Sequence, residues 1–196
     1  MTRLLLVRHG QSEWNAEGRW QGQADPPLSP LGEEQARSAI GQLDGIDAVY
    51  ASDLVRASHT AEIVAGELGV EVVVDARLRE RHAGEWQGHT RAEIEVAWPG
   101  YLAAGERPPG WEHDDVVIER ALEACASIAG AHPDGMVLLV THGGVVRSLE
   151  RHLGDLDDQL LPNLGGRWLV HDGEDFRLGD RVLLIEGVAV TRPQQI

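Results

Sequence analysis

The chain contains no lysine, so all 17 of its basic residues are arginine. The absence of lysine excludes the lysine-dependent phosphate loop of P-loop proteins and any Schiff-base chemistry. Cysteine is nearly absent too, and the single Cys125 allows neither an intramolecular disulfide nor a thiolate metal cluster. We interpret Cys125 as a small core residue; a reactive thiol is the alternative.

Long apolar segments are also missing. The run at residues 4–7 is too short for the apolar region of a signal peptide, and no run approaches membrane-spanning length. A net charge of −15 and a pI near 4.9 would repel nucleic acid and anionic membranes. We therefore expect a soluble cytoplasmic protein with neither as a partner, in which any phosphate site is a local cluster of arginines.

The chain is long enough for one hydrophobic core, with 196 residues of which 42% are hydrophobic. Strand-like and helix-like segments alternate, which predicts an α/β fold: a three-layer α/β/α sandwich with a mostly parallel central sheet. We expect a single domain over residues 1–196, with an irregular, cap-like insertion at about 88–120. The expected strands are 4–8, 48–52, 70–74, 137–141, 168–170 and 181–185, and the expected helices 30–43, 53–68, 114–131 and 145–153, with a loop over 10–27.

Two stretches nearly repeat each other, and each ends in a His-Gly pair. They are Leu-Leu-Leu-Val-Arg-His-Gly at 4–10 and Val-Leu-Leu-Val-Thr-His-Gly at 137–143. Such apolar runs are typical of buried parallel strands, and ligands of α/β sheets bind at the carboxyl ends of these strands. We therefore expect His9 and His142 to share one crevice. The alternative is two unrelated core strands that merely end in histidine.

Two arginines and two glutamates are candidates for phosphate chemistry. Arg8 precedes His9, and Arg56 falls on the first turn of a predicted helix, where a cation is favourable only if it meets an anion. An ion pair with a nearby carboxylate is the alternative for Arg56. Cleavage of a phosphoester also needs a proton donor for the departing oxygen, and Glu80 and Glu85 both qualify by residue type.

At these segments the chain resembles the histidine phosphatase superfamily, which includes phosphoglycerate mutases and a branch of phosphatases. The matching segments follow the family order: Arg8-His9-Gly10, Trp14-Asn15, Gln21-Gly22, Ser52 to Thr60, Leu78 to Gly88, Thr141-His142-Gly143 and Pro162-Asn163. The motif at Leu78 to Gly88 selects Glu80 rather than Glu85. Within the family, residues 79–88 most resemble phosphatases of the glucosyl-3-phosphoglycerate type.

The resemblance implies a role for each matching residue. His9 would be the nucleophile, Arg8, Arg56, His142 and Asn15 would hold the phosphoryl oxygens, and Glu80 would act as acid and base. Further substrate contacts would come from Gln21, Gly22, His82 and Gly143. The implied reaction is hydrolysis of a small phosphorylated metabolite by a metal-independent enzyme without a cofactor. A mutase and a non-catalytic phosphate-binding module are the alternatives, and a homo-oligomer is left open.

The predicted cap bears on the choice between phosphatase and mutase. Between residues 90 and 115, Arg91 and Arg107 are outnumbered by six acidic residues: Glu93, Glu95, Glu106, Glu112, Asp114 and Asp115. This count predicts that a second phosphate finds little to hold it. Trp111 and His113 stand where many family phosphatases have Gly and Ser, so they either reshape the entrance or are neutral surface changes.

Overall fold

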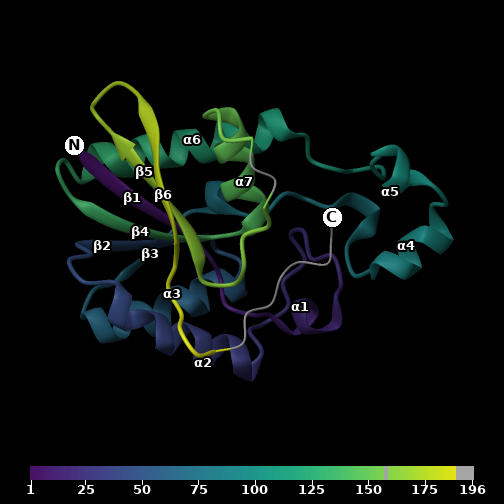
Figure 1. Ribbon diagram of the computed structural model, residues 1–196, viewed down its shortest axis with the longest axis horizontal. Coiled ribbons are helices and arrows are strands. Elements are labelled where there is room, and N and C mark those ends of the chain that lie inside the picture. The colour runs from purple at the N-terminus through teal and green to yellow at the C-terminus, as the bar shows by residue number, and fades with distance from the viewer. Residues whose placement is uncertain (157–158, 189–196) are drawn as a thin grey trace.

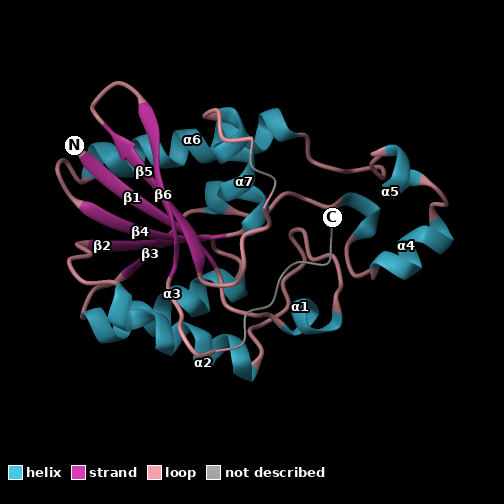
Figure 2. Ribbon diagram, in the orientation of Figure 1, coloured by secondary structure: helices cyan, strands magenta, loops and turns pink. Residues whose placement is uncertain are grey.

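The computed structural model describes residues 1–156 and 159–188. Its centre is one six-stranded sheet with strand order β3-β2-β4-β1-β5-β6, covered by helices on both faces (Figures 1 and 2). Four strands are parallel and the last two run antiparallel at one edge. The predicted α/β/α sandwich with a mostly parallel sheet is confirmed. The strands are β1 (Thr2–Arg8), β2 (Ala48–Ala51), β3 (Val72–Val74), β4 (Met136–Thr141), β5 (Gly165–His171) and β6 (Phe176–Leu183).

Helices α2 (Pro30–Ala39) and α3 (Val55–Leu68) cover one face, and α6 (Asp114–Ala131) and α7 (Gly143–His152) cover the other (Figure 1). Strand β1 is buried on both faces, as its continuous apolar run predicts. Leu5 and Val7 pack toward α2 and α3, whereas Leu4 and Leu6 pack toward α6 and α7. Cys125 lies in the second of these cores, where burial raises the pKa of its thiol to about 12, in agreement with a core role.

The predicted loop and insertion contain short helices that the hydrophobic pattern does not reveal. Helix α1 (Glu13–Glu17) lies within the expected loop, and α4 (Arg91–Ala97) and α5 (Tyr101–Ala104) lie within the expected irregular segment. Capping boxes at Ser12 and Thr90 begin α1 and α4, so local side-chain hydrogen bonds specify these helices rather than an apolar face. The remaining helical segments are single 3-10 turns at Ile40–Gln42, Ala76–Leu78 and Gly84–Trp86.

Several predicted boundaries are wrong. Helix α7 begins at Gly143 rather than at residue 145, because the backbone turns helical directly after His142. Strand β3 begins two residues late, at Val72. The antiparallel strands β5 and β6 are longer than their apolar runs, since this pair, of which β6 is the sheet edge, buries only part of each strand. Strand β6 also ends before Leu184 and Ile185, which pack into the core.

The segment between residues 88 and 113 projects from one end of the sandwich, where α4 and α5 stand apart from the sheet (Figure 1). We call residues 88–113 the cap. No helix in the described part of the chain is both long and apolar enough to cross a membrane.

Candidate active site

The two histidines are brought together by strand pairing. His9 follows β1 and His142 follows β4; these strands are parallel neighbours, with Arg8 opposite Thr141. The ring centroids lie 5.1 Å apart in an edge-to-face arrangement. Parallel strands that end at the same level therefore place both imidazoles at the carboxyl edge of the sheet, as expected.

The hydrogen bonds of His9 define its tautomer. Nδ1 lies 2.6 Å from the carbonyl oxygen of Gly10, which only accepts, so Nδ1 carries the proton. The other nitrogen, Nε2, accepts from Nε of Arg56 at 3.2 Å. Burial lowers the pKa of His9 well below its usual value, and the charges of Arg56 and Arg8 lower it further. At neutral pH, Nε2 therefore presents a lone pair.

Arg56 is fully buried on the first turn of α3. Its remaining donors bind the carbonyl oxygens of Gly22 at 2.7 Å and Ala24 at 2.8 Å. None of its hydrogen bonds goes to a described carboxylate, so the ion-pair alternative is not what the structure contains. Burial lowers the pKa of Arg56 to about 10, which leaves it charged at neutral pH. A buried cation without an ion pair is costly unless a ligand supplies the anion.

Arg8 is the second buried guanidinium, with 3% of its surface exposed. Its Nη1 donates to the carbonyl oxygen of Leu161 at 2.8 Å. Burial lowers the pKa of Arg8 to about 10, while the nearby Glu80 opposes this shift and Arg56 adds to it. Two guanidiniums thus remain charged next to the lone pair of His9, a combination suited to binding a phosphoryl group and attacking it.

His142 is fully buried, and neither of its ring nitrogens has a hydrogen-bond partner among the described residues. Buried polar atoms almost always have partners, so an unsatisfied imidazole beside His9 indicates a place for a ligand oxygen. Burial, followed by the charge of Arg56, lowers the pKa of His142 well below its usual value. The ring is therefore neutral and can donate one hydrogen bond.

The loop after β1 contains the short helix α1, which places polar side chains at the site. The capping box of α1 fixes Asn15, whose Oδ1 accepts from the backbone of Ser12. The Ser12 hydroxyl in turn donates to Oε1 of Gln21 at 2.6 Å. Gly22 has φ +53°, and a side chain there would collide with Gln87 and Ala83. The tight turn at Gly22 directs its carbonyl oxygen toward Arg56.

Glu80 faces the same site from the segment after β3. Its Oε1 accepts from the amide of Arg81 at 2.8 Å and its Oε2 from the amide of Gly144 at 3.1 Å. A Cβ at Gly144 would lie 2.2 Å from Oε1 of Glu80, so only glycine lets the carboxylate reach the start of α7. Glu85, the other acid suggested by residue type, is exposed and does not line the cavity described below.

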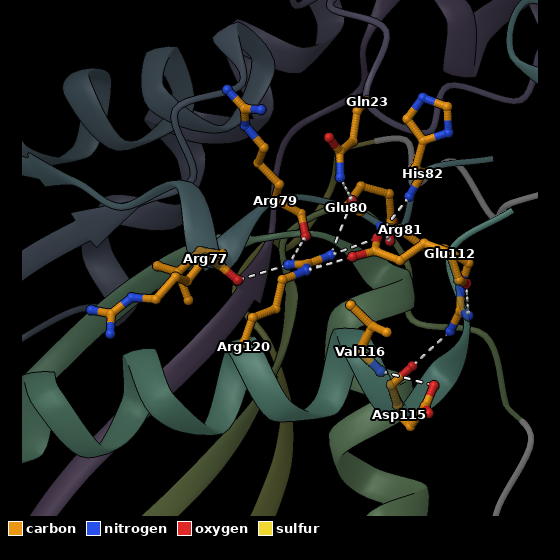
Figure 3. Close-up of polar contacts among 12 residues, drawn as sticks. Gln23, Arg77, Arg79, Glu80, Arg81, His82, Glu112, Asp115, Val116 and Arg120 are labelled. Carbon is orange, nitrogen blue, oxygen red and sulfur yellow. Dashed lines mark hydrogen bonds and ion pairs between the residues drawn. The ribbon is translucent and has the colours of Figure 1, made fainter. Parts of the chain in front are cut away.

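Arg120 of α6 fixes the backbone around Glu80 (Figure 3). It donates to the carbonyl oxygens of Arg77 at 2.7 Å, Arg79 at 2.6 Å and Glu80 at 3.2 Å. Its remaining contacts go to both carboxylate oxygens of Glu112, at 2.9 and 3.0 Å. One guanidinium therefore ties the segment that carries Glu80 both to α6 and to the end of the cap.

These residues open into a cavity of about 680 Å³ between the sheet edge and the cap. The cavity is lined by Arg8, His9, Asn15, Gln21, Gly22, Arg56, Glu80 and Gly143, which are the predicted residues that the structure brings together there. His142 is not among the residues that line the cavity, but its ring packs edge-to-face against that of His9. His82 is also outside the wall, because its ring nitrogen Nδ1 bonds the backbone of Gly84 and approaches Gly110.

Trp111 and His113 both line the cavity, so they are part of its entrance. Trp111 packs edge-to-face against Trp20 and Trp86, with ring centroids 5.8 and 5.7 Å away. It also pairs with Ala83 through an isolated β-bridge. Trp111 therefore fastens the cap to the segment after Glu80.

Two positioning residues escaped the sequence reasoning. The Thr60 hydroxyl accepts from the amide of Gly10 at 3.1 Å and donates to the Arg56 carbonyl at 2.7 Å. The Asn163 side chain donates to the His9 carbonyl at 2.9 Å. Both lie within motifs of the family, but their partners are distant in sequence, so no local pattern could have assigned these contacts.

The nine histidines of the chain do not assemble into a metal site in the part that the structure describes. No group of three or more His, Cys, Asp or Glu side chains with the spacing for a metal ion occurs among the described residues. In the site itself, positive charge is supplied by arginine.

Comparison with known proteins agrees with this arrangement. A family model described as histidine phosphatase superfamily (branch 1) matches residues 4–174. A glucosyl-3-phosphoglycerate phosphatase of Mycolicibacterium vanbaalenii is 39% identical over 178 residues, covering 84% of this chain and 79% of that protein. A metal-independent phosphoserine phosphatase of Arabidopsis thaliana is 38% identical over 160 residues, covering 76% of this chain and 67% of that protein.

A solved structure is similar over nearly the whole chain. The mycobacterial glucosyl-3-phosphoglycerate phosphatase in complex with VO3 superimposes with a TM-score of 0.81 at 34% identity, covering 90% of this chain and 96% of that one. The ordered motifs, the paired histidines and the family match lead to one conclusion. The chain belongs to the histidine phosphatase superfamily.

Proposed function

We propose that the protein is a metal-independent phosphomonoesterase that works through a phosphohistidine at His9. One observation carries the proposal: the lone pair of His9 Nε2 points at the guanidinium of Arg56, while Nδ1 is held by the Gly10 carbonyl. A phosphoryl group bound by Arg56 would therefore meet the attacking nitrogen. The relatives named as phosphatases support the same reaction class.

In the first step, Nε2 of His9 forms a bond to phosphorus as the ester P–O bond breaks. Charge grows on the three equatorial oxygens, which Arg8, Arg56, His142 and Asn15 are placed to hold. Glu80 gives its proton to the departing alkoxide. The alcohol leaves, and the phosphoryl group remains on a histidine between two guanidiniums.

In the second step, the Glu80 carboxylate takes a proton from water, and the hydroxide attacks phosphorus. The P–N bond breaks and returns the electron pair to Nε2 of His9. Inorganic phosphate leaves, and Glu80 is again protonated. The amides of Arg81 and Gly144 hold the carboxylate in place through both steps.

Metal independence can be tested by chelation. Two buried guanidiniums already supply the charge that a divalent ion would bring to a phosphoryl group. We expect the rate of phosphate release to be unchanged after exhaustive treatment with a chelator. Loss of activity that zinc or magnesium restores would instead require a metal-assisted mechanism.

A mutase is the competing enzyme. A mutase must keep its phosphohistidine from water, whereas here only a short chain segment, which includes the cap, separates Glu80 from His142. We expect incubation with 3-phosphoglycerate and catalytic 2,3-bisphosphoglycerate to release inorganic phosphate. Efficient formation of 2-phosphoglycerate without phosphate would show a mutase. No turnover on a broad panel of phosphomonoesters would favour the phosphate-binding module.

The substrates we propose are small sugar phosphates or phosphoglycerate-type compounds. The relatives named for glucosyl-3-phosphoglycerate support this class, and a cavity of about 680 Å³ has room for more than a phosphate. We place the enzyme in the cytoplasm, with neither nucleic acid nor membrane as a partner.

A further inference from the structure

The cavity is far more basic than the chain as a whole. The net charge of the protein is −15, yet seven arginines and only three acidic residues of the described chain line the cavity. Beyond Arg8 and Arg56, the arginines are Arg81, Arg91, Arg107, Arg147 and Arg151. The fold therefore concentrates positive charge at one place on an acidic protein.

The cap adds more arginines than acids to the cavity wall, although acidic residues outnumber arginines in its sequence. Of its six neighbouring acids, only Asp114 and Asp115 line the cavity, whereas both Arg91 and Arg107 do. Two of the others are occupied elsewhere, because Glu93 pairs with Arg19 and Glu112 with Arg120. The count of charges that predicts little to hold a second phosphate therefore does not describe the cavity wall, because it ignores which way each side chain points.

Arg107 is held by aromatic rings rather than by an acid. Its guanidinium lies 4.9 Å from the ring centroid of Trp111 and 5.9 Å from that of Trp86, and it forms no ion pair with a described carboxylate. A second cation, Arg81, lies 5.5 Å from the same Trp111 ring. Burial lowers the pKa of Arg107 and the charge of Arg81 lowers it further, whereas the charge of Asp114 opposes both effects. Asp114 pairs with Arg81, so a single nearby carboxylate stands against these two guanidiniums among the residues that the structure describes.

Arg91, from the first turn of α4, is the other cap arginine on the cavity wall. It too forms no ion pair with a described carboxylate, although acidic residues surround it in sequence. Arg91 and Arg107 are thus the two cap arginines on the cavity wall, and neither forms an ion pair with a described carboxylate. Leu102 and Trp111 line the wall with them and offer apolar surface for a carbon skeleton.

We propose that Arg91 and Arg107 form a second anion subsite, which binds a carboxylate or phosphate of the substrate while its reacting phosphoryl group lies at His9. The planar fork of arginine matches both groups. This inference rests on the proposed phosphatase function and narrows it to substrates with two anionic groups. The cap thereby becomes the element that selects the substrate.

The test compares pairs of substrates that differ in the second anion. 3-Phosphoglycerate is compared with glycerol 3-phosphate for a carboxylate, and fructose 1,6-bisphosphate with fructose 6-phosphate for a phosphate. We expect the wild-type enzyme to prefer the doubly anionic member of at least one pair, and that pair identifies the anion. Equal kcat/KM within both pairs would overturn the subsite.

Variants of the two arginines test whether these residues cause the preference for doubly anionic substrates. Arg91→Met and Arg107→Met should each reduce it by about five- to tenfold, the scale of an exposed charge-assisted hydrogen bond, mainly through KM. Arg37→Met is the matched control, because Arg37 lies on α2, is mostly exposed, pairs with Glu33 and does not line the cavity. A preference that survives in the Arg91→Met/Arg107→Met double variant would contradict the proposal.

Binding separates this inference from the proposed function. In a His9→Ala background, which cannot turn over, the Kd for 3-phosphoglycerate or fructose 1,6-bisphosphate is measured with and without Arg107→Met. Weaker binding by the His9→Ala/Arg107→Met variant than by His9→Ala supports the subsite even if hydrolysis fails. Hydrolysis of p-nitrophenyl phosphate with unchanged Kd values would support the phosphatase and reject the subsite.

Discussion

Replacing His9 with alanine abolishes turnover, by at least about four orders of magnitude for phosphomonoester hydrolysis. The reason is that Nε2 of His9 is the only proposed nucleophile and its lone pair is aimed at the phosphate-binding guanidinium of Arg56. We do not expect the neighbouring His142 to substitute, because it does not line the cavity and its proposed role is to donate a hydrogen bond to a phosphoryl oxygen. The measurement is the steady-state rate of phosphate release.

The control for this experiment is His152→Ala. His152 is an exposed residue in the last turn of α7 and does not line the cavity, so its loss should leave the rate unchanged. Circular dichroism and thermal unfolding of both variants check that the fold is intact. Substantial activity in a folded His9→Ala protein would remove the nucleophile from the mechanism.

Replacing Glu80 with glutamine lowers turnover by about two to four orders of magnitude on alkyl phosphates, the range typical of a general acid. The loss should be much smaller on p-nitrophenyl phosphate, because nitrophenolate leaves without a proton. Glutamine also keeps only one oxygen, whereas both oxygens of Glu80 accept backbone amides, from Arg81 and Gly144. Comparing leaving groups separates the lost proton from this lost contact.

Glu85→Gln is the matched control, since Glu85 has the same residue type, lies nearby in sequence and is exposed. It should match the wild type on every leaving group. An equal loss on alkyl and nitrophenyl substrates in Glu80→Gln would mean that Glu80 positions the substrate rather than donating a proton.

Much of the site follows from the sequence because local patterns specify it. The apolar runs that end at His9 and His142 predict neighbouring parallel strands, and strand pairing then places the imidazoles side by side. The position of Arg56 on the first turn of α3 also follows, because the sequence shows where β2 ends and the next helix begins. The choice of Glu80 over Glu85 does not follow from residue type; it needed the order of motifs in the family.

The rest depends on contacts between distant segments. Arg120 holds carbonyl groups some forty positions earlier in the chain, and nothing in the sequence near Arg120 indicates those partners. The sequence was least informative about the charge that the cap presents to the cavity. Its arginines point into the cavity while most of its acids do not, and composition contains no information about that direction.

The short helices of the loop and cap were missed for a related reason. Helix α1 has no apolar face that would show as a periodic pattern, and its local signals are the capping box at its start and Gly18 at its end. The Ser-x-x-Asn spacing at Ser12 and Asn15 is visible in the sequence and could have been used. It matters for function because it fixes Asn15 on the cavity wall.

The central claim is that a phosphoryl group is transferred to His9, and trapping the phosphoenzyme tests it most directly. Enzyme mixed with a labelled phosphomonoester is quenched within one turnover, and the labelled peptide is identified. The account predicts a phosphoryl group on His9 that is labile in acid and stable in base, and no label in His9→Ala. A label that is stable in acid, or one attached to a residue other than His9, would contradict the account.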